Sequence, residues 1–425
     1  MVIILNLIFF PLANYNSKVN IRICNESSLI NHNLKTSKVS SKIFINGTLD
    51  WIDFRNAGNC TGTGTYSNPY IIEDLIIDGG GSGSCIHIEN SDVFFRIENC
   101  TIYNSGVDYY YSDAGVKLYN VSNGFIKKNT ITNNNAGIIV SGTNNTISQN
   151  TITNNGFGIL ASGDCTILEN DVINNVIGIL GGQDLSISLN NVSFNDMYGI
   201  WIFWGFNNSI VDNYINNNNG TGILILEAWY NEIIGNEINN NKGNGIHLEG
   251  SIMIDPWGEP YYVQSCTNNW ISENMVNYNL CGIMLNITKE NDIINNSIND
   301  NKNGGLELYF SRDIQISNNQ INENYYGIKM VESILNYVFQ NTINYNYYGI
   351  YLYSSYGNGI YYNILHYNRK CYTETDDCYG NNLFENNDCI ETKDNNILIW
   401  IIPLTIIIII SVLAIIILLL RHKRT

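Results

Sequence analysis

Four ionisable residues in the second half of the chain could converge to carry acid–base chemistry: His247, Glu249, Glu307 and Lys329. Polysaccharide hydrolysis uses two carboxyl groups a few ångströms apart, and proton abstraction uses a positioned acid and base. We take Glu249 and Glu307 as candidate acid or base, His247 as a candidate proton shuttle, and Lys329 as a further candidate. The catalytic residues otherwise stay unknown.

Aromatic residues form a second candidate set. Their rings could stack on sugar rings or pack against another protein, because large apolar strips on a surface mark contact sites. We expect ligand contacts from Trp201, Phe203, Trp204, Trp229, Trp257, Tyr261, Tyr309 and Tyr351. Two other interpretations stay open: the loop 251–265 covers these rings, or the rings are scattered surface residues.

Both sets lie on a repeat marked by Gly followed by Ile, Val or Leu. Most copies are about 22 residues apart, and they begin at Gly115, Gly137, Gly158, Gly178, Gly199, Gly222, Gly245, Gly282, Gly305, Gly327 and Gly349. A fixed period of this length is typical of a solenoid, in which each unit buries its apolar face only against its neighbours.

The rest of the unit indicates which solenoid this is. Two apolar residues five apart precede each Gly, as in Ile147 and Ile152, and Asn usually stands two positions before the second, as in Asn150. Apolar residues never follow helical spacing for two turns, whereas Ile-x-Leu alternates as a half-buried strand does. Asn and Gly both tolerate the left-handed backbone of sharp bends.

We therefore predict an all-β, right-handed parallel β-helix of about a dozen coils of 20–23 residues. Residues one and three after each Gly should point inward, and residues two and four outward. The outward positions include Trp201, Phe203, His247, Glu249 and Glu307, which places the candidate residues on one face. Identical Asn side chains should stack into ladders between coils.

Composition limits the partners. Formal net charge is −17 and 14% of residues are charged, with no basic stripe, so we expect no nucleic-acid partner. The ten cysteines form an even number, which suggests disulfides, while Cys165 and Cys281 could be small core residues. No C-x-x-C pair occurs and the histidines are scattered, so we expect no metal site and no cofactor, with calcium left possible.

The order of segments suggests a membrane-anchored protein. We divide the chain into a possible signal peptide (1–13), a linker (14–42), an N-terminal cap with the first irregular coils (43–104), repeats (105–365, with an insertion near 251–265), a Cys-containing C-terminal cap and stalk (366–396), a transmembrane helix (397–420) and a cytoplasmic tail (421–425). The apolar segment 397–420 is long enough to span a bilayer, and the Arg-His-Lys-Arg after it favours the cytoplasmic side. We expect a single-pass protein of the cell membrane with its β-helix extracellular and its C-terminus cytoplasmic.

The Asn-x-Ile and Gly-Ile-x-Leu repeat, together with Gly-x-Gly-Thr-x-x-Asn-Pro-Tyr at 62–70, resembles the right-handed parallel β-helix superfamily. The resemblance is to the NosD-like and CASH-type, pectate-lyase-like surface proteins of bacteria and archaea, and it covers about 43–365. Because the fold hosts enzymes and adhesins alike, the resemblance leaves the activity open. The outward apolar and aromatic positions, together with the expected membrane anchor, predict an elongated face that binds a polysaccharide, glycan or surface protein, in adhesion or envelope interaction. The alternative is a membrane-tethered polysaccharide lyase, glycoside hydrolase or uronate epimerase; the repeats lack the Asp-Asp pair that such hydrolases carry.

Overall fold

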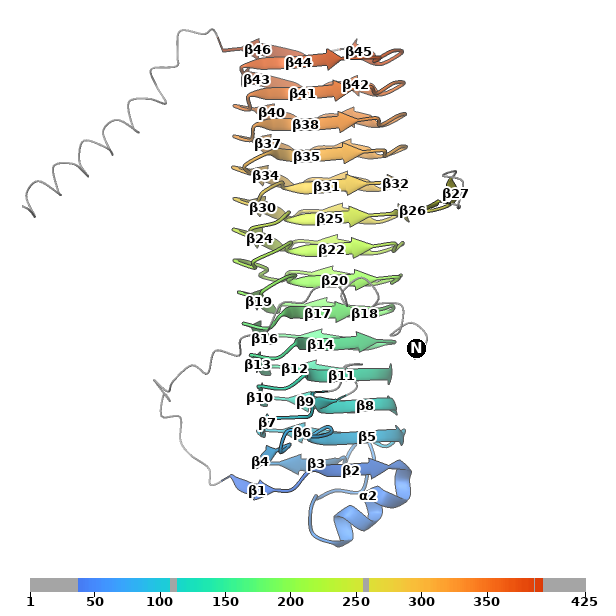
Figure 1. Ribbon diagram of the computed structural model, residues 1–425, viewed down its shortest axis with the longest axis vertical. Coiled ribbons are helices and arrows are strands. Elements are labelled where there is room, and N and C mark those ends of the chain that lie inside the picture. The colour runs from blue at the N-terminus through green and yellow to red at the C-terminus, as the bar shows by residue number, and fades with distance from the viewer. Residues whose placement is uncertain (1–36, 108–112, 255–259, 386, 393–425) are drawn as a thin grey trace, which may run out of the picture.

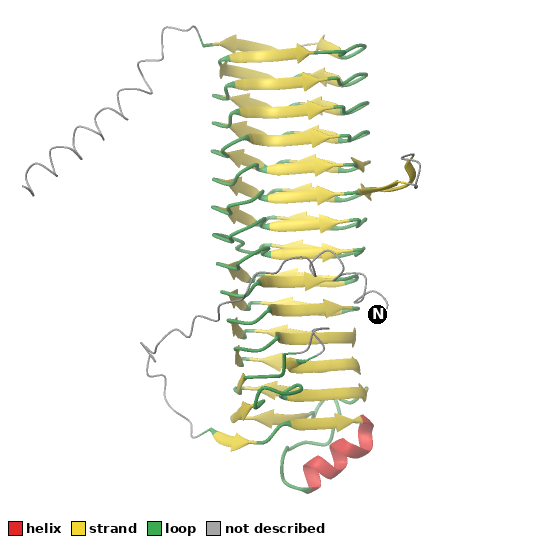
Figure 2. Ribbon diagram, in the orientation of Figure 1, coloured by secondary structure: helices red, strands yellow, loops and turns green. Residues whose placement is uncertain are grey.

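The chain winds into a rod of stacked parallel coils (Figure 1). The structure is a computed structural model that describes residues 37–107, 113–254, 260–385 and 387–392. Nearly all regular structure is β-strand, and the strands run across the rod axis (Figure 2). The prediction of a parallel β-helix is confirmed, with fourteen strands in each of its two largest sheets.

Apart from one coil, in which only isolated bridges at Tyr214 reach the neighbouring coils on the third face, each coil contributes one strand to each of three faces. Sheet B consists of β2 (Ile43–Asn46), β5 (Ile86–Ser91), β8 (Ala114–Ser122), β11 (Ala136–Thr143), β14 (Phe157–Ser162), β17 (Ile177–Gly181), β20 (Ile200–Phe203), β22 (Ile223–Leu226), β25 (Ile246–Glu249), β31 (Ile283–Asn286), β35 (Gly304–Tyr309), β38 (Tyr326–Val331), β41 (Tyr348–Tyr353) and β44 (Lys370–Thr375).

Sheet C follows sheet B along each coil. It consists of β3 (Tyr70–Glu73), β6 (Phe95–Glu98), β9 (Gly124–Lys127), β12 (Asn145–Ser148), β15 (Cys165–Leu168), β18 (Leu185–Ser188), β21 (Ser209–Val211), β23 (Glu232–Ile234), β29 (Trp270–Ser272), β33 (Asp292–Ile294), β36 (Gln315–Ser317), β39 (Tyr337–Phe339), β42 (Gly359–Tyr361) and β45 (Asn382–Glu385).

Sheet A, the third face, is divided into two halves of seven strands. The first half is β1 (Lys38–Ser40), β4 (Leu75–Asp78), β7 (Thr101–Tyr103), β10 (Thr130–Thr132), β13 (Thr151–Thr153), β16 (Asp171–Ile173) and β19 (Asn191–Ser193). The second half is β24 (Glu237–Asn239), β30 (Met275–Asn277), β34 (Ser297–Asn299), β37 (Gln320–Asn322), β40 (Thr342–Asn344), β43 (Ile364–Asn368) and β46 (Asp388–Glu391).

The predicted alternation in sheet B is present. In β20, Ile200 and Ile202 are fully buried in the core, and Trp201 and Phe203 point out of the sheet. One continuous core of inward Ile, Leu and Val side chains runs from Ile43 to Cys371. Each inward side chain packs against the side chain at the same position of the next coil. A nearly constant repeat length therefore keeps the coils in register along the rod.

The repeat glycines are needed for a different reason from the one predicted from sequence. None of them has a positive φ; a Cβ on Gly178 would lie 2.5 Å from the carbonyl oxygen of Gly199 and 2.6 Å from Val192. Close approach of successive coils therefore excludes a side chain there. The left-handed residues are instead the ones next to the ladder asparagines, such as Asn154 and Asn174.

Stacked asparagines line the bends, as predicted. Asn213 donates from Nδ2 to the carbonyl oxygen of Ile187 at 2.8 Å and to Oδ1 of Asn236 at 3.0 Å. Its own Oδ1 accepts from the backbone nitrogen of Asn190 at 3.0 Å. These buried amides bond backbone groups of the preceding coil at the end of a strand and in the bend, so each bend is locked to the next.

Both ends of the rod are closed by features that the repeat does not contain. At the first coil, helix α2 (Gly47–Asn56) places Trp51 in the core, where its ring stacks on Tyr70 with centroids 4.9 Å apart. At the other end the solenoid continues beyond Leu365 for another coil, β44 to β46, and a disulfide joins Cys371 to Cys389. Cys165 and Cys281 are free and buried in the rod.

The insertion after β25 forms an antiparallel hairpin of β26 (Ser251–Ile254) and β27 (Pro260–Gln264), which projects away from the rod (Figure 1). Two short strands, β28 (Cys266–Thr267) and β32 (Thr288–Lys289), pair beside it. Among the described residues, no helix is long and apolar enough to cross a membrane. The possible signal peptide at 1–13 and the expected transmembrane segment at 397–420 lie outside the described residues.

Candidate functional site

The outer face of sheet B carries a buried carboxyl group near the C-terminal end of the rod. Glu307 points outward from β35, yet it is only 3% exposed. A Cβ on Gly304 would lie 2.5 Å from the Glu307 carboxylate, so the missing side chain makes room for this acid. Because an isolated buried charge is costly, Glu307 needs close partners.

Tyr309 and Lys329 supply those partners. The hydroxyl of Tyr309 donates to Oε2 of Glu307 at 2.6 Å, and Nζ of Lys329 donates to the Tyr309 oxygen at 2.8 Å. Nζ of Lys329 also lies 3.8 Å from the same carboxylate oxygen. Burial, together with the hydrogen bond to Glu307, raises the pKa of Tyr309 well above its usual range, so the phenol keeps its proton.

A ladder of tyrosines borders this network on the next coils. Tyr326 and Tyr348 occupy the position before the repeat Gly and stack with centroids 5.3 Å apart. Nζ of Lys329 lies 5.2 Å from the centroid of the Tyr326 ring, and Nζ of Lys370 lies 5.7 Å from that of Tyr348. The half-buried rings of this ladder lie beside Tyr351, whose ring centroid is 5.2 Å from that of Tyr326.

The sequence interpretation missed Tyr326 and Tyr348. Their signal was the recurrence of Tyr-Tyr-Gly-Ile at 325–328 and 347–350. Within the strands that follow each repeat Gly, ligand contacts were expected only at the outward positions after Gly. The residue before Gly also faces out, and Tyr326 there is in register with Gly304.

The other candidate acid belongs to a separate cluster. Nε2 of His247 lies 2.9 Å from Oε2 of Glu249, whose Oε1 accepts from Asn286 at 2.8 Å. Strand β31 separates β25 from β35, with Met284 in register between His247 and Glu307. The four ionisable candidates therefore form two clusters, and the structure does not bring Glu249 and Glu307 into one hydrogen-bonded group.

The aromatic candidates of the middle coils lie in a second apolar cluster on the outer face of sheet B. This cluster includes Ile139, Leu160, Leu180, Trp201 and Leu224, with Phe203 and Leu226 at its edge. Although these side chains point out of the sheet, Trp201 is only 7% exposed, and its ring lies 5.4 Å from that of Tyr198. Little of the Trp201 ring is thus open to a ligand.

Half-buried rings follow where sheet B turns toward sheet C. Phe203 stacks on Trp204 at 5.0 Å, and Phe206 stacks on Trp229 at 5.8 Å between ring centroids. The Trp204 ring nitrogen donates to the Glu227 carboxylate. Trp257 lies outside the described residues.

The backbone of Tyr261 belongs to β27, the second strand of the projecting hairpin. In Figure 1 this hairpin extends sideways from the end of β25 and leaves the outer face of sheet B uncovered. The described part of the loop 251–265 therefore does not cover that face.

The stacked coils and three-faced core define a parallel β-helix repeat protein. The sequence profile of one family matches residues 13–187, 95–254 and 260–411, and its description is "Periplasmic copper-binding protein (NosD)". The chain belongs to the NosD family, which confirms the resemblance drawn from its repeat. No curated protein matches the chain in sequence.

Solved structures with the same fold include carbohydrate-active proteins. The A-module of mannuronan C-5 epimerase AlgE6 from Azotobacter vinelandii superposes with a TM-score of 0.51 at 13% identity, covering 84% of this chain and 97% of its own. The Dettilon tailspike protein superposes with a TM-score of 0.47 at 14% identity, covering 76% of this chain and 61% of its own. The periplasmic alginate epimerase AlgG superposes with a TM-score of 0.44 at 13% identity, covering 84% of this chain and 85% of its own. At such identities the likeness concerns the fold.

The described residues do not fit a copper site. Three ligating side chains come together in Cys371, Cys389 and Glu391, but the two sulfurs are joined in the disulfide and offer no thiolate. The described histidines are far apart along the rod, and each lies beside a carboxylate: His87 beside Glu89, His247 beside Glu249, and His366 beside Asp388. The described residues therefore offer no set of side chains that would hold copper.

Proposed function

We propose that the chain binds an extended carbohydrate along the outer face of sheet B. The observation that carries this proposal is the Glu307–Tyr309–Lys329 network together with the Tyr326–Tyr348 ladder. Carboxylate, hydroxyl and ammonium groups beside aromatic rings are the groups that bind sugar hydroxyls and ring faces.

The shape of the face also supports a long ligand. Fourteen parallel strands at a spacing of roughly 4.8 Å make a face about 60 Å long. Equivalent positions recur once per coil, so a polymer of similar units meets similar contacts repeatedly. Half-buried Phe203 and Trp204 lie toward the middle of the rod, and the tyrosine ladder lies toward its C-terminal end.

Location outside the cytoplasm is part of the proposal. The family description names a periplasmic protein, and the Cys371–Cys389 disulfide forms in oxidising compartments. The apolar segment 397–420 would then anchor the rod to a membrane and point it outward, for adhesion or envelope interaction. A surface protein is the other partner that this face could bind.

A second candidate function is polysaccharide cleavage or epimerisation at the same network. The network joins a carboxylate, a phenol and an ammonium, which are the kinds of group that remove a proton from a sugar carbon and return one to it. Hydrolysis needs two cooperating carboxyl groups, and Glu249 and Glu307 belong to separate clusters, so a lyase or epimerase fits better than a hydrolase.

One screen separates these functions. The full-length chain is tested on a glycan array and for polysaccharide cleavage, with and without calcium, beside the variants Lys329→Met and Lys302→Met. Binding that Lys329→Met weakens tenfold or more and Lys302→Met preserves supports carbohydrate binding. Unsaturated or reducing-end product that disappears in Glu307→Gln supports the enzyme. No binding and no turnover for any glycan contradicts both.

A further inference from the structure

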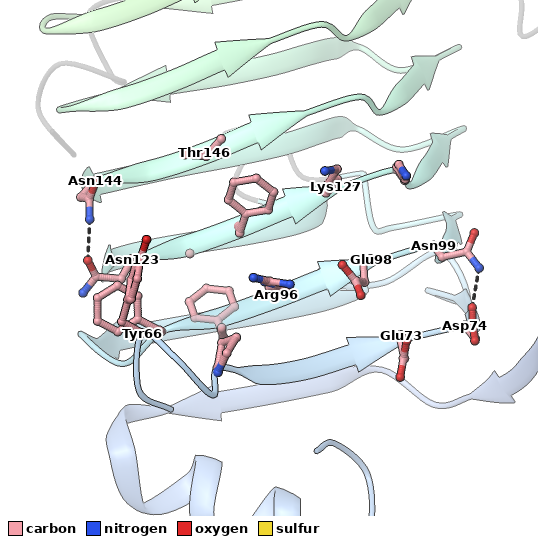
Figure 3. A pocket seen from close by; sticks show the side chains of 16 residues that line it. Tyr66, Glu73, Asp74, Arg96, Glu98, Asn99, Asn123, Lys127, Asn144 and Thr146 are labelled. Atoms are coloured by element: carbon pink, nitrogen blue, oxygen red, sulfur yellow. Dashed lines mark hydrogen bonds between the residues drawn. The ribbon is translucent and has the colours of Figure 1, made fainter. Parts of the chain in front are cut away.

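A groove lies on sheet C, at the N-terminal end of the rod, on a different face from the proposed binding site. Its volume is about 790 Å³, and its floor is formed by outward side chains of β6 and β9. Arg96 lies in register with Phe125, and Glu98 with Lys127. Figure 3 shows Tyr66 at one end of the groove, Arg96 in the middle and Glu98 with Lys127 toward the other end.

The charged side chains of this floor have no partners among the described residues. Arg96, Glu98 and Lys127 make no side-chain hydrogen bond or ion pair there; Lys127 only lies 5.8 Å from the centroid of the Phe125 ring. Unpaired charges that converge in a groove are available to a ligand.

Charge in the groove differs from the rest of the chain. Its lining holds three cations, Arg96, Lys127 and Lys128, against three acids, Glu73, Asp74 and Glu98. The whole chain has 21 cations against 38 acids. The groove is thus a local break in a strongly acidic surface, so it repels an acidic ligand less than the rest of the chain does.

The glycine motif at 62–70 builds the wall of this groove. Gly64 accepts a hydrogen bond at its carbonyl oxygen from the backbone nitrogen of Phe94 at 3.0 Å, and its positive φ lets the loop lie against Tyr70. Thr63 and Asn68 close the loop with a 2.9 Å backbone hydrogen bond. The tied loop holds Tyr66 82% exposed, with its ring 5.5 Å from Phe94.

We infer that this groove binds a short oligosaccharide that carries a carboxylate. Rings of Tyr66 and Phe125 offer apolar faces to the sugar, and the planar guanidinium of Arg96 can hold a carboxylate through two parallel hydrogen bonds. Glu98 accepts hydrogen bonds from sugar hydroxyls. The site does not depend on the proposed face of sheet B, because the two sheets face different directions.

Titration calorimetry with two matched probes tests this inference. The probes are a galacturonate hexamer and its fully methyl-esterified form, which keeps the sugar and removes the charge. In the full-length chain, Arg96→Gln should lower the affinity for the acid hexamer tenfold or more and leave the affinity for the ester nearly unchanged. Phe125→Ala should weaken both probes. Arg312→Gln, an exposed cation near the other end of the rod, should change neither.

The inference is overturned if the acid hexamer shows no saturable binding, or if Arg96→Gln binds it as tightly as the unmodified chain. Equal loss of acid and ester in Arg96→Gln would also overturn the carboxylate assignment. Lys329→Met separates the two sites, because it should leave this binding intact whatever its effect on sheet B. Arg96 is exposed, so its replacement leaves the core unaltered.

Discussion

Nζ of Lys329 lies 2.8 Å from the phenolic oxygen of Tyr309, and the two residues come from adjacent coils of the rod. Tyr309 passes this contact on to the buried Glu307 through its own hydroxyl. The stacking that builds the core therefore also assembles the polar network on its outer surface.

The Tyr309 phenol should make stability depend on pH in the alkaline range. Its raised folded-state pKa means that its stabilising effect is complete below the unfolded pKa near 10 and is lost as pH rises toward the folded value. Tyr309→Phe should lower the melting temperature at pH 8 and flatten its decline above pH of about 10. Melting curves from pH 8 to 11 check this, with Tyr362→Phe as the control for loss of an exposed hydroxyl. A parallel decline in Tyr309→Phe and the unmodified chain would contradict it.

Removing one rung of an asparagine ladder should destabilise the middle of the rod. Asn213→Ala removes the hydrogen-bond donors to Ile187 and Asn236 and the acceptor for Asn190. We expect the free energy of unfolding to fall by on the order of 3 kcal/mol. Asn219→Ala, an exposed asparagine of the same coil, should change stability by less than about 0.5 kcal/mol. Chemical denaturation measures both, and equal effects would show that the ladder is unimportant.

The repeat glycine should tolerate no methyl group. Gly178→Ala puts a Cβ 2.5 Å from the Gly199 carbonyl oxygen, which forces two coils apart, so we expect a loss of at least about 3 kcal/mol. In Gly58→Ala the added Cβ meets no atom within 4 Å. Only the left-handed φ of this residue disfavours a side chain, so we expect a loss of stability of about 1–2 kcal/mol. A smaller loss at Gly178 than at Gly58 would refute the close-approach explanation.

The disulfide should hold the last coil. It joins Cys371 to the exposed Cys389 across an 18-residue separation, and closing such a loop contributes about 3 kcal/mol. Cys389→Ser, or a reductant on the unmodified chain, should speed amide hydrogen exchange in Asp388–Glu391 and leave Thr342–Asn344 unchanged. Exchange at the same rate with and without the bond would argue against this role.

Periodicity was enough to predict the coils, because the inward Ile of each unit can be buried only in one way. Helix α2 was not predicted, since its ten residues show no apolar stripe and only Trp51 is buried. The Glu307 site was predicted in part: Glu307, Tyr309 and Lys329 were chosen from their outward positions. Their hydrogen bonds, the burial of Glu307 against Gly304 and the tyrosine ladder depend on contacts between coils, which spacing along one coil does not show.

The most direct test of carbohydrate binding on sheet B is an amide hydrogen-exchange footprint of the full-length chain. It is recorded with and without the strongest ligand from the glycan array. Binding at the proposed face predicts slower exchange concentrated in β35, β38 and β41, and loss of that protection in Lys329→Met. Protection confined to other strands, or protection that Lys329→Met retains in full, would contradict the account.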